Sequence, residues 1–567
     1  MKIQIDRPFA ETLIAEFSEL GMLAEQLKIG HRAEISAFQL GQGQLDFLYD
    51  LYTRAGPNLN GKAVQLASLK SALTYEGQRF QDGELEQLVP AITRFLVENA
   101  CRGWLFENNT QGKAVPYLVA RIDFTPPGEE ESGRVLLELK ANAMGKVQAK
   151  NLLITERDIG GKTVAEIFAG KGYFKETPSL IASYDASEAR FFEWRSAYGK
   201  QFSGSGFGIF ADDPQASHRT TDWSRKSRVI LSSAGGQARL VNDEEILKQR
   251  DLTLTIAGEP LAKYLRKAER SDRFNARVEK DAEALHSDIP PNLFTRLPVH
   301  GYILMFHMDL HHHLWVHVDD MQPYQYQPEL KDKLVLPSLQ TELIDILTAE
   351  MDVLMDDIVS GKSGGTTVLC SGPAGVGKTL TAEVYSEIIQ RPLYRVHSGQ
   401  LGLNVGEMEK VLRETLTRAQ RWGAVMLIDE ADVYIKRRDD NIAANAVVGV
   451  FLRVLEYFNG LLFLTTNRVD DIDEAIISRC IAVIRYHQPT PDERYRIWQV
   501  MVEQFGLPVD DSLLQRLAEL FPDACGRDIK GLSKLVAKYC QHRGLQPSED
   551  IFLRCSIFRG MDAIEAA

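Results

Sequence analysis

One stretch of the sequence has the residue types and spacing that phosphate binding requires. Residues 372–379 read GPAGVGKT, an instance of the pattern G-x-x-x-x-G-K-[ST]. Glycines in such a loop let backbone N–H groups turn inward around phosphate oxygens, and the N-terminus of the following helix adds partial positive charge. We predict that Lys378 reaches the β- and γ-phosphates of a nucleotide and that Thr379 binds Mg²⁺. The expected nucleotide contacts in this loop are Gly372, Pro373, Ala374, Gly375, Val376, Gly377, Lys378, Thr379 and Leu380.

Two adjacent carboxylates, Asp429 and Glu430, follow the apolar run AVMLI at residues 424–428. After a phosphate-binding loop, we expect Asp429 to belong to the Mg²⁺ shell, so Thr379 and Asp429 are the predicted metal residues. Glu430 lies one position further along, where it can orient and polarise an attacking water. An Asp-Glu pair here favours hydrolysis over phosphate transfer to a small molecule. The sequence thus predicts an ATPase that uses ATP and Mg²⁺.

Three further polar side chains are candidates for the same chemistry. Asn467 ends the apolar run LLFLTTN, and its amide can hold the water or the γ-phosphate. Arg479 ends a predicted helix in IDEAIISRC, where a guanidinium suits the charge on the leaving phosphoryl group; an arginine finger is worth about 10³–10⁵ in rate. If Arg479 serves a neighbouring subunit, the protein must be an oligomer; the alternative is a solvated surface arginine. Arg527, in CGRDIKGL, is a second candidate γ-phosphate contact, and a surface position at a helix N-terminus is its alternative.

The elements that must position these side chains are visible after residue 338. Five short apolar runs, separated by helical stretches, read TTVLC, PLYRV, AVMLI, LLFLT and IAVIRY. This alternation is typical of a parallel sheet covered by helices on both faces. After Pro491 only helical periodicity remains, which predicts a small helical domain. We therefore expect an α/β domain over 338–490 and a helical lid over 491–567.

The preceding 337 residues have a different pattern of apolar residues. Residues 1–115 show mostly helical spacing of leucine and isoleucine, and 116–320 contain short β-rich runs, so we expect an α+β region that binds a substrate or partner. Residues 321–337 contain three prolines and several polar residues, which indicates a linker.

Six of the twelve histidines fall within residues 300–317. If this stretch were one strand, alternation would place five metal-ligating side chains on one face: His307, Asp309, His311, His313 and His317. That set suits Zn²⁺, Fe or Ni. The alternative is the polar, half-exposed face of an antiparallel strand, and the sequence leaves both open.

The ordered set of phosphate loop, Asp-Glu pair, Asn467 and Arg479, followed by a helical lid, resembles the AAA+ ATPases over roughly residues 335–545. Residues 445–479 resemble the second region of homology of the AAA subgroup. This resemblance implies an α/β P-loop NTPase fold with a helical lid, ATP held between subunits, and a ring that is usually a hexamer. It also implies that hydrolysis remodels a macromolecule, which the N-terminal part selects.

Two departures from the family pattern bear on mechanism. AAA members that thread polypeptide usually carry an aromatic pore-loop residue before a Gly-Glu pair, whereas HSGQLGLNVGEME (397–409) offers Leu403 and Val405 and no aromatic residue. Hand-over-hand threading is therefore in doubt. The AAA subgroup also usually has two arginines in an R-P-G-R run, but this chain has the single Arg479 in Ser-Arg-Cys, which is similar to the clamp-loader branch. The trans-acting chemistry would then rest on Arg479, either alone or with help from Arg453 or Arg468.

Composition narrows the choice of client and compartment. The net charge of −13 argues against a chain-wide basic surface for nucleic acid, so a protein client is expected. A nucleic-acid motor or loader remains an alternative, because the run Lys436-Arg437-Arg438 could line a channel or lie on a solvated helix; a nucleotide-gated assembly switch is another. Six scattered cysteines and the absence of a signal peptide or long apolar run predict a cytoplasmic protein without a membrane segment.

Overall fold

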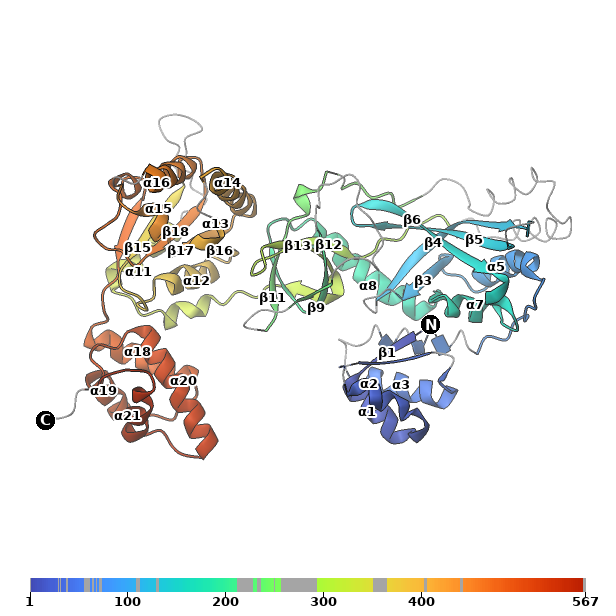
Figure 1. The fold of residues 1–567 in the computed structure, drawn as a ribbon, viewed down its shortest axis with the longest axis horizontal. Helices are drawn as coiled ribbons and strands as arrows, with labels where there is room; N and C mark the ends of the chain where they lie inside the picture. The colour runs from blue at the N-terminus through green and yellow to red at the C-terminus, as the bar shows by residue number, and fades with distance from the viewer. Residues whose placement is uncertain are drawn as a thin grey trace.

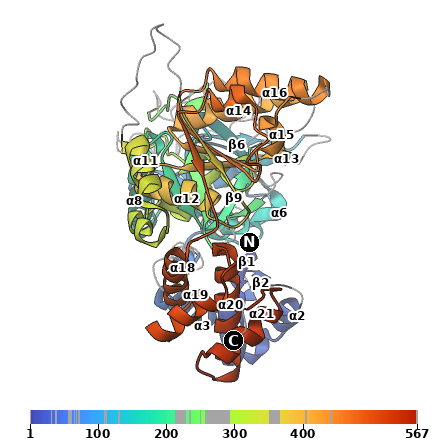
Figure 2. The ribbon, with the colours of Figure 1, turned by 90° about the vertical axis from the view of Figure 1, so that its left-hand side faces the viewer.

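The computed structural model describes residues 2–28, 30, 32–36, 39–55, 62–63, 66–67, 69–70, 74–108, 113–128, 132–211, 228–231, 236–248, 250–255, 293–349, 365–401, 405–438 and 442–563. Figure 1 shows an elongated molecule in which three sheets follow one another along the long axis. The N-terminal module and the C-terminal helices both project to one side of that axis, as Figures 1 and 2 show. No described helix is long and apolar enough to span a bilayer.

The N-terminal module combines helices with a two-stranded antiparallel sheet. Ile3 and Ile5 face its core while Gln4 is exposed, which is strand alternation. Residues 1–115, expected to be mostly helical, therefore also contain strands, because a five-residue alternation is too short to stand out beside longer helical spacing. The elements up to residue 108 are β1 (Lys2–Asp6), α1 (Arg7–Glu16), η1 (Ser18–Leu20), α2 (Met22–Leu27), β2 (Arg32–Ser36), α3 (Gln42–Arg54), η4 (Leu85–Gln87), α5 (Leu88–Val97) and β3 (Trp104–Asn108).

A five-stranded antiparallel sheet follows, with strand order β6-β5-β4-β3-β7. It shares one apolar core with α5, α7 and α8. Its further elements are β4 (Ala114–Thr125), β5 (Arg134–Ala143), β6 (Lys146–Thr155), α6 (Glu156–Ile159), α7 (Val164–Gly170), β7 (Tyr173–Lys175) and α8 (Pro178–Arg195).

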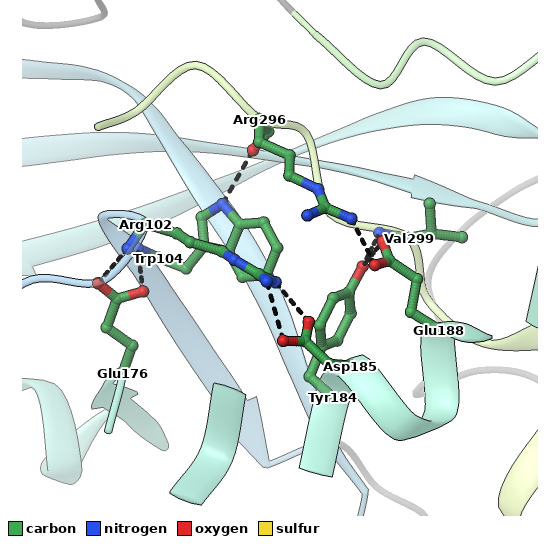
Figure 3. A network of polar contacts seen from close by, with 8 residues as sticks. All are labelled: Arg102, Trp104, Glu176, Tyr184, Asp185, Glu188, Arg296 and Val299. Atoms are coloured by element: carbon green, nitrogen blue, oxygen red, sulfur yellow. Dashed lines mark hydrogen bonds and ion pairs between the residues drawn. The ribbon is translucent and has the colours of Figure 1, made fainter. Parts of the chain in front are cut away.

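A polar network fixes α8 against this sheet (Figure 3). Arg102 Nη2, just before β3, donates to Asp185 Oδ2 at 2.9 Å. Tyr184 Oη donates to Glu188 Oε1 at 2.7 Å and accepts from Val299 N at 2.9 Å. These bonds connect α8 to the start of β3 and to the strand-like segment around residue 299.

The second large sheet has seven strands in the order β10-β9-β13-β12-β11-β8-β14, all paired antiparallel. Strand β14 and helix η8 lie in the stretch 321–337 that we expected to be a linker, since Met321–Pro323 pair with β8. The elements are β8 (Gln201–Gly204), β9 (Gly206–Phe210), β10 (Arg228–Leu231), β11 (Ala238–Asn242), η6 (Glu244–Ile246), β12 (Tyr302–His307), β13 (His312–His317), η7 (Val318–Asp320), β14 (Met321–Pro323) and η8 (Pro328–Lys333).

The histidine-rich stretch is a hairpin, and the interpretation of it as one strand is wrong. A turn at Met308–His311, with φ of +55° at His311, separates β12 from β13 and pairs His307 with His312. The face expected to unite His307, Asp309, His311, His313 and His317 therefore does not exist. Within the described ranges, no three His, Cys, Asp or Glu side chains converge as metal ligands.

The third sheet is parallel, as predicted, and its five strands are the five apolar runs. Its order is β16-β17-β18-β15-β19, and Figure 1 shows helices on both of its faces. The elements from here to residue 485 are α11 (Ser338–Ala349), β15 (Thr366–Ser371), α12 (Lys378–Ile388), β16 (Leu393–His397), α13 (Ser398–Leu401), α14 (Val405–Trp422), β17 (Val425–Asp429), α15 (Asp432–Ile435), α16 (Ile442–Leu455), β18 (Leu461–Thr466), α17 (Glu474–Ile477) and β19 (Ala482–Arg485).

The C-terminal part is helical, also as predicted. Its helices bury a core of their own around Trp498, Leu517 and Phe552. They are α18 (Pro491–Gln504), α19 (Asp511–Leu520), α20 (Gly526–Arg543) and α21 (Glu549–Ile557).

Candidate functional site

A cavity of about 740 Å³ lies where the carboxyl ends of the parallel strands meet the C-terminal helices. Such a size is ordinary for a small-molecule site. Its lining includes the predicted residues 374–380, Asp429, Glu430, Asn467 and Arg527. Four elements far apart in the sequence therefore converge here: the phosphate loop, the ends of β17 and β18, and the start of α20.

Lys378 is the first residue of α12 and is held by oxygens at the base of the loop. Its Nζ donates to the carbonyl oxygens of Gly372 at 2.8 Å and Pro373 at 2.5 Å, and to Asn467 Oδ1 at 3.0 Å. Burial lowers the pKa of Lys378, while the charge of Asp429 opposes that shift. The cation is thus placed beside the helix N-terminus, where phosphate oxygens can replace neutral acceptors.

Three glycines of the loop, Gly372, Gly375 and Gly377, have backbone conformations that other residues rarely adopt. Gly377 precedes α12 with φ of +103°, and Gly375 has φ of +85°. A Cβ on Gly375 would lie 2.5 Å from Cys525 Sγ and 3.0 Å from Arg527 Cβ. The backbone N–H of Arg527 also donates to the Gly375 carbonyl at 3.2 Å. The start of α20 is therefore packed directly on the phosphate loop.

Asp429 and Thr379 meet as the sequence predicts. Thr379 Oγ1 donates to Asp429 Oδ1 at 3.0 Å, and Thr465 Oγ1 donates to the same oxygen at 2.5 Å. Burial alone would raise the pKa of Asp429, but hydrogen bonds from the two threonines and the charge of Arg395 outweigh it and lower the pKa. An ionised carboxylate beside a hydroxyl is a hard-oxygen donor set, which fits Mg²⁺.

Glu430 follows Asp429 with φ of +55°, a left-handed backbone that is uncommon for a residue with a side chain. Two bonds to Thr465 fix this turn: Glu430 N donates to its Oγ1 at 3.1 Å, and Ala431 N donates to its carbonyl at 2.9 Å. The turn exposes the Glu430 side chain at the cavity. The adjoining strand β18 thus fixes the backbone that carries this carboxylate.

Asn467 and the two candidate arginines lie in different places. Asn467 N donates to Asp432 Oδ1 at 3.2 Å, while its side-chain oxygen accepts from Lys378. Arg527 lines the cavity from the lid. Arg479 is not among the lining residues of its own chain; its Nη1 donates to the Ala475 carbonyl at 3.1 Å, and its guanidinium forms an ion pair with Glu456.

Sequence reasoning missed two contributors to the site. Arg395 on β16 donates from Nη2 to Asp429 Oδ2 at 2.6 Å and forms an ion pair with Glu383 at 3.3 Å. Residues 333–337, assigned to a linker, line the cavity together with residues of α18. The apolar run Leu334-Val335-Leu336 in an otherwise polar stretch was an available signal for the second; Arg395 carried none, because an arginine in a strand has many possible partners.

The basic run after α15 is engaged in local ion pairs. Arg438 Nε lies 2.9 Å from Asp473 Oδ2, and Arg437 Nη2 lies 3.2 Å from Glu474 Oε1. These pairs neutralise two of the three charges that a nucleic-acid channel would use. In the segment considered for a pore loop, Val405 begins α14, and Leu403 lies outside the described residues.

Comparison with known proteins identifies similar chains. Residues 368–487 match the model of the "ATPase family associated with various cellular activities (AAA)". A "Putative 26S proteasome regulatory subunit homolog" of Methanothermobacter marburgensis is 31% identical over 187 residues, which cover 31% of this chain and 49% of that protein. Spastin of Drosophila willistoni is 26% identical over 220 residues, 37% of this chain and 26% of spastin. The matched part thus spans half or less of these relatives.

Among solved structures, the crystal structure of the FIGL-1 AAA domain in complex with ADP aligns with a TM-score of 0.31 and 23% identity. That alignment covers 38% of this chain and 74% of the FIGL-1 chain.

Proposed function

We propose that this protein, whose residues 368–487 match the AAA family model, hydrolyses ATP with Mg²⁺ at the cavity described above and uses the energy to remodel a protein client. The observation that carries the proposal is the bonded set of Lys378, Thr379, Asp429 and Asn467, which unites the phosphate loop with β17 and β18. Each of these side chains suits one part of a nucleoside triphosphate.

The residues divide the work as follows. In the loop 372–380, the backbone N–H groups of 374–380 and the ammonium of Lys378 bind the phosphates, and Thr379 and Asp429 would hold Mg²⁺, which when bound neutralises phosphate charge. Glu430 orients the attacking water and accepts its proton, since it lines the cavity directly after Asp429. Asn467 holds the water or the γ-phosphate, and Arg527 reaches the γ-phosphate from the lid.

Arg479 acts on the nucleotide of a neighbouring subunit, so the working form is a homo-oligomeric ring, a hexamer. Support comes from its position: it lies at the surface beyond α17 and away from the cavity of its own chain. Its ion pair with Glu456 keeps the guanidinium in place until a neighbour offers a developing phosphoryl charge.

Residues 1–320 hold the client, and the client is a protein in the cytoplasm. The acidic net charge and the ion-paired Arg437 and Arg438 favour a protein over nucleic acid, and all six cysteines are free, as in a reducing compartment. The names of two similar proteins, a proteasome regulatory subunit homolog and spastin, are compatible with this assignment.

Phosphate release by the full-length protein, with and without candidate clients, tests this function. Turnover that needs Lys378, Mg²⁺ and Arg479 together supports it. Stimulation by DNA or RNA, with strong salt dependence, would instead favour the nucleic-acid motor. Negligible turnover combined with nucleotide-dependent oligomer size would favour the assembly switch.

A further inference from the structure

A buried carboxylate joins the seven-stranded sheet to the ATPase domain. Asp243, just after β11, has a fully buried side chain. Its Oδ1 accepts from Arg421 Nη2 at 2.5 Å and from Trp422 Nε1 at 2.7 Å, both at the end of α14, and its Oδ2 lies 2.7 Å from His313 Nε2 on β13. Because an unpaired buried charge is costly, only the packing arrangement of the sheet on α14 that keeps Asp243 paired is favourable.

The residues around Asp243 are closely packed. Gly199 has φ of +69°, and a Cβ there would lie 2.8 Å from the Trp422 Cα, so the two backbones touch. Phe306 on β12 is 1% exposed; its ring centroid lies 5.1 Å from that of Trp422 and 5.7 Å from that of Tyr394 on β16. Phe306 belongs to the same apolar core as the residues of α14 and β17.

This junction lies one residue from the nucleotide site. Tyr394 precedes Arg395, whose guanidinium holds Asp429 Oδ2 at 2.6 Å. Among the strands that the structure describes, β16 is hydrogen-bonded to β17 alone and lies at the edge of the sheet, so the packing of Tyr394 against Phe306 and Trp422 supplies lateral support. Figure 1 shows the seven-stranded sheet beside the part of the ATPase domain that carries β16 and α12.

A second contact reaches the helix that follows the phosphate loop. Tyr324 Oη donates to Glu387 Oε1 at 2.7 Å, and Gln327 N donates to Glu387 Oε2 at 3.0 Å. Glu387 lies on α12, which begins with Lys378 and Thr379. The seven-stranded sheet and the chain leaving it thus brace two elements that present phosphate- and Mg²⁺-binding side chains.

We infer that the seven-stranded sheet packs in one fixed position on the ATPase domain and thereby positions Arg395 against Asp429, which tunes Mg²⁺ binding. Asp243 is the positioning residue that holds the sheet in this place. This inference rests on the proposed ATPase function. Arg395 competes with Mg²⁺ for Asp429 and places positive charge beside the Mg²⁺ donors, so it raises the Mg²⁺ concentration that the site requires.

The experiment is a Mg²⁺ titration of the full-length protein with two readouts, ATP turnover and calorimetric binding of a slowly hydrolysed ATP analogue, comparing Asp243→Asn, Arg395→Ala and the double variant. Asp243→Asn weakens the contact between the sheet and α14 and so weakens the Arg395–Asp429 pair. The Mg²⁺ concentration at half-saturation should therefore fall about threefold or more in Asp243→Asn. It should fall at least as much in Arg395→Ala. The double variant should shift no further than Arg395→Ala, because both changes act through the same pair. The matched control is Asp319→Asn, since Asp319 bonds Ser187 and Arg190 on α8, away from the junction.

The outcomes separate this inference from the proposed function. If the wild-type protein has no ATPase activity, the proposed function fails. If it hydrolyses ATP but Asp243→Asn behaves like Asp319→Asn, or if the two shifts add in the double variant, only the coupling is overturned. Should Asp243→Asn fail to fold by circular dichroism, Phe306→Leu, which keeps an apolar side chain at the junction, should give the same direction of shift, and an unchanged Mg²⁺ requirement would refute the coupling.

Discussion

Replacing Gly375 by alanine tests the contact between the phosphate loop and the lid. Gly375 has φ of +85°, and an added Cβ would lie 2.5 Å from Cys525 Sγ and 3.0 Å from Arg527 Cβ. The left-handed conformation costs an L-residue about 1–2 kcal/mol, and overpacking costs about 1–3 kcal/mol more. The chain can relieve the second cost by moving α20 away from the loop, which withdraws Arg527 from the nucleotide.

The affinity for ATP should therefore fall at least about 30-fold, the equivalent of about 2 kcal/mol. Titration calorimetry with a slowly hydrolysed ATP analogue and Mg²⁺ measures this loss. Thermal unfolding followed by circular dichroism checks that the fold survives, since a domain tolerates a few kcal/mol of strain.

A second substitution makes the prediction specific. Cys525→Ala removes the sulfur from the clash and should restore about tenfold of the affinity lost in Gly375→Ala, while the strained φ and the Arg527 contact remain. Cys525→Ala alone is the control and should bind the analogue within about twofold of the wild-type protein. Unchanged binding by Gly375→Ala, or no recovery on adding Cys525→Ala, would refute the packing of the lid on the loop.

Three further outcomes are expected. Arg479→Ala should lower turnover about 10³-fold with little change in nucleotide affinity, and mixing it with Lys378→Ala subunits should restore activity, because each subunit supplies what the other lacks; no recovery on mixing would contradict a trans role. Burial lowers the pKa of His300 to about 4. Between pH 6.5 and 4, this histidine is therefore protonated in the unfolded chain and neutral in the folded chain. The free energy of unfolding should fall by up to roughly 3 kcal/mol over this pH range. His300→Gln should flatten this dependence in thermal melts and exposed His312→Gln should not; equal slopes would exclude His300 as the cause. Asp429→Asn should raise the Mg²⁺ concentration needed for turnover about tenfold or more, measured in the same titration as above, because the lost carboxylate charge is what Mg²⁺ binds; an unchanged requirement would remove Asp429 from the Mg²⁺ shell.

The parts of the molecule that could be predicted from the sequence are those fixed by local physics. A buried parallel strand must be a continuous apolar run, so β15 to β19 are visible in the sequence, and the phosphate loop between β15 and α12 has a pattern that chemistry dictates. The helical lid could be predicted as well, because the apolar residues of α18 to α20 recur with a helical period.

The parts that could not be predicted depend on contacts between distant residues. The stretch from residue 302 to 317 alternates like one strand, and only the turn at His311 shows that it is a hairpin. Arg395 is an ordinary strand residue until β16 and β17 lie side by side and bring it to Asp429. Asp243 likewise gains its role from α14, which lies 178 residues further along the chain at Arg421.

Phosphate release with Mg²⁺ and ATP by the full-length protein and its Glu430→Gln variant tests the central claim most directly. The account predicts measurable turnover by the wild-type protein and a loss of about 10²-fold or more in Glu430→Gln, which should still bind ATP, because only the group that orients the water is removed. Equal turnover by the two proteins would contradict the assignment of this cavity as the site of hydrolysis.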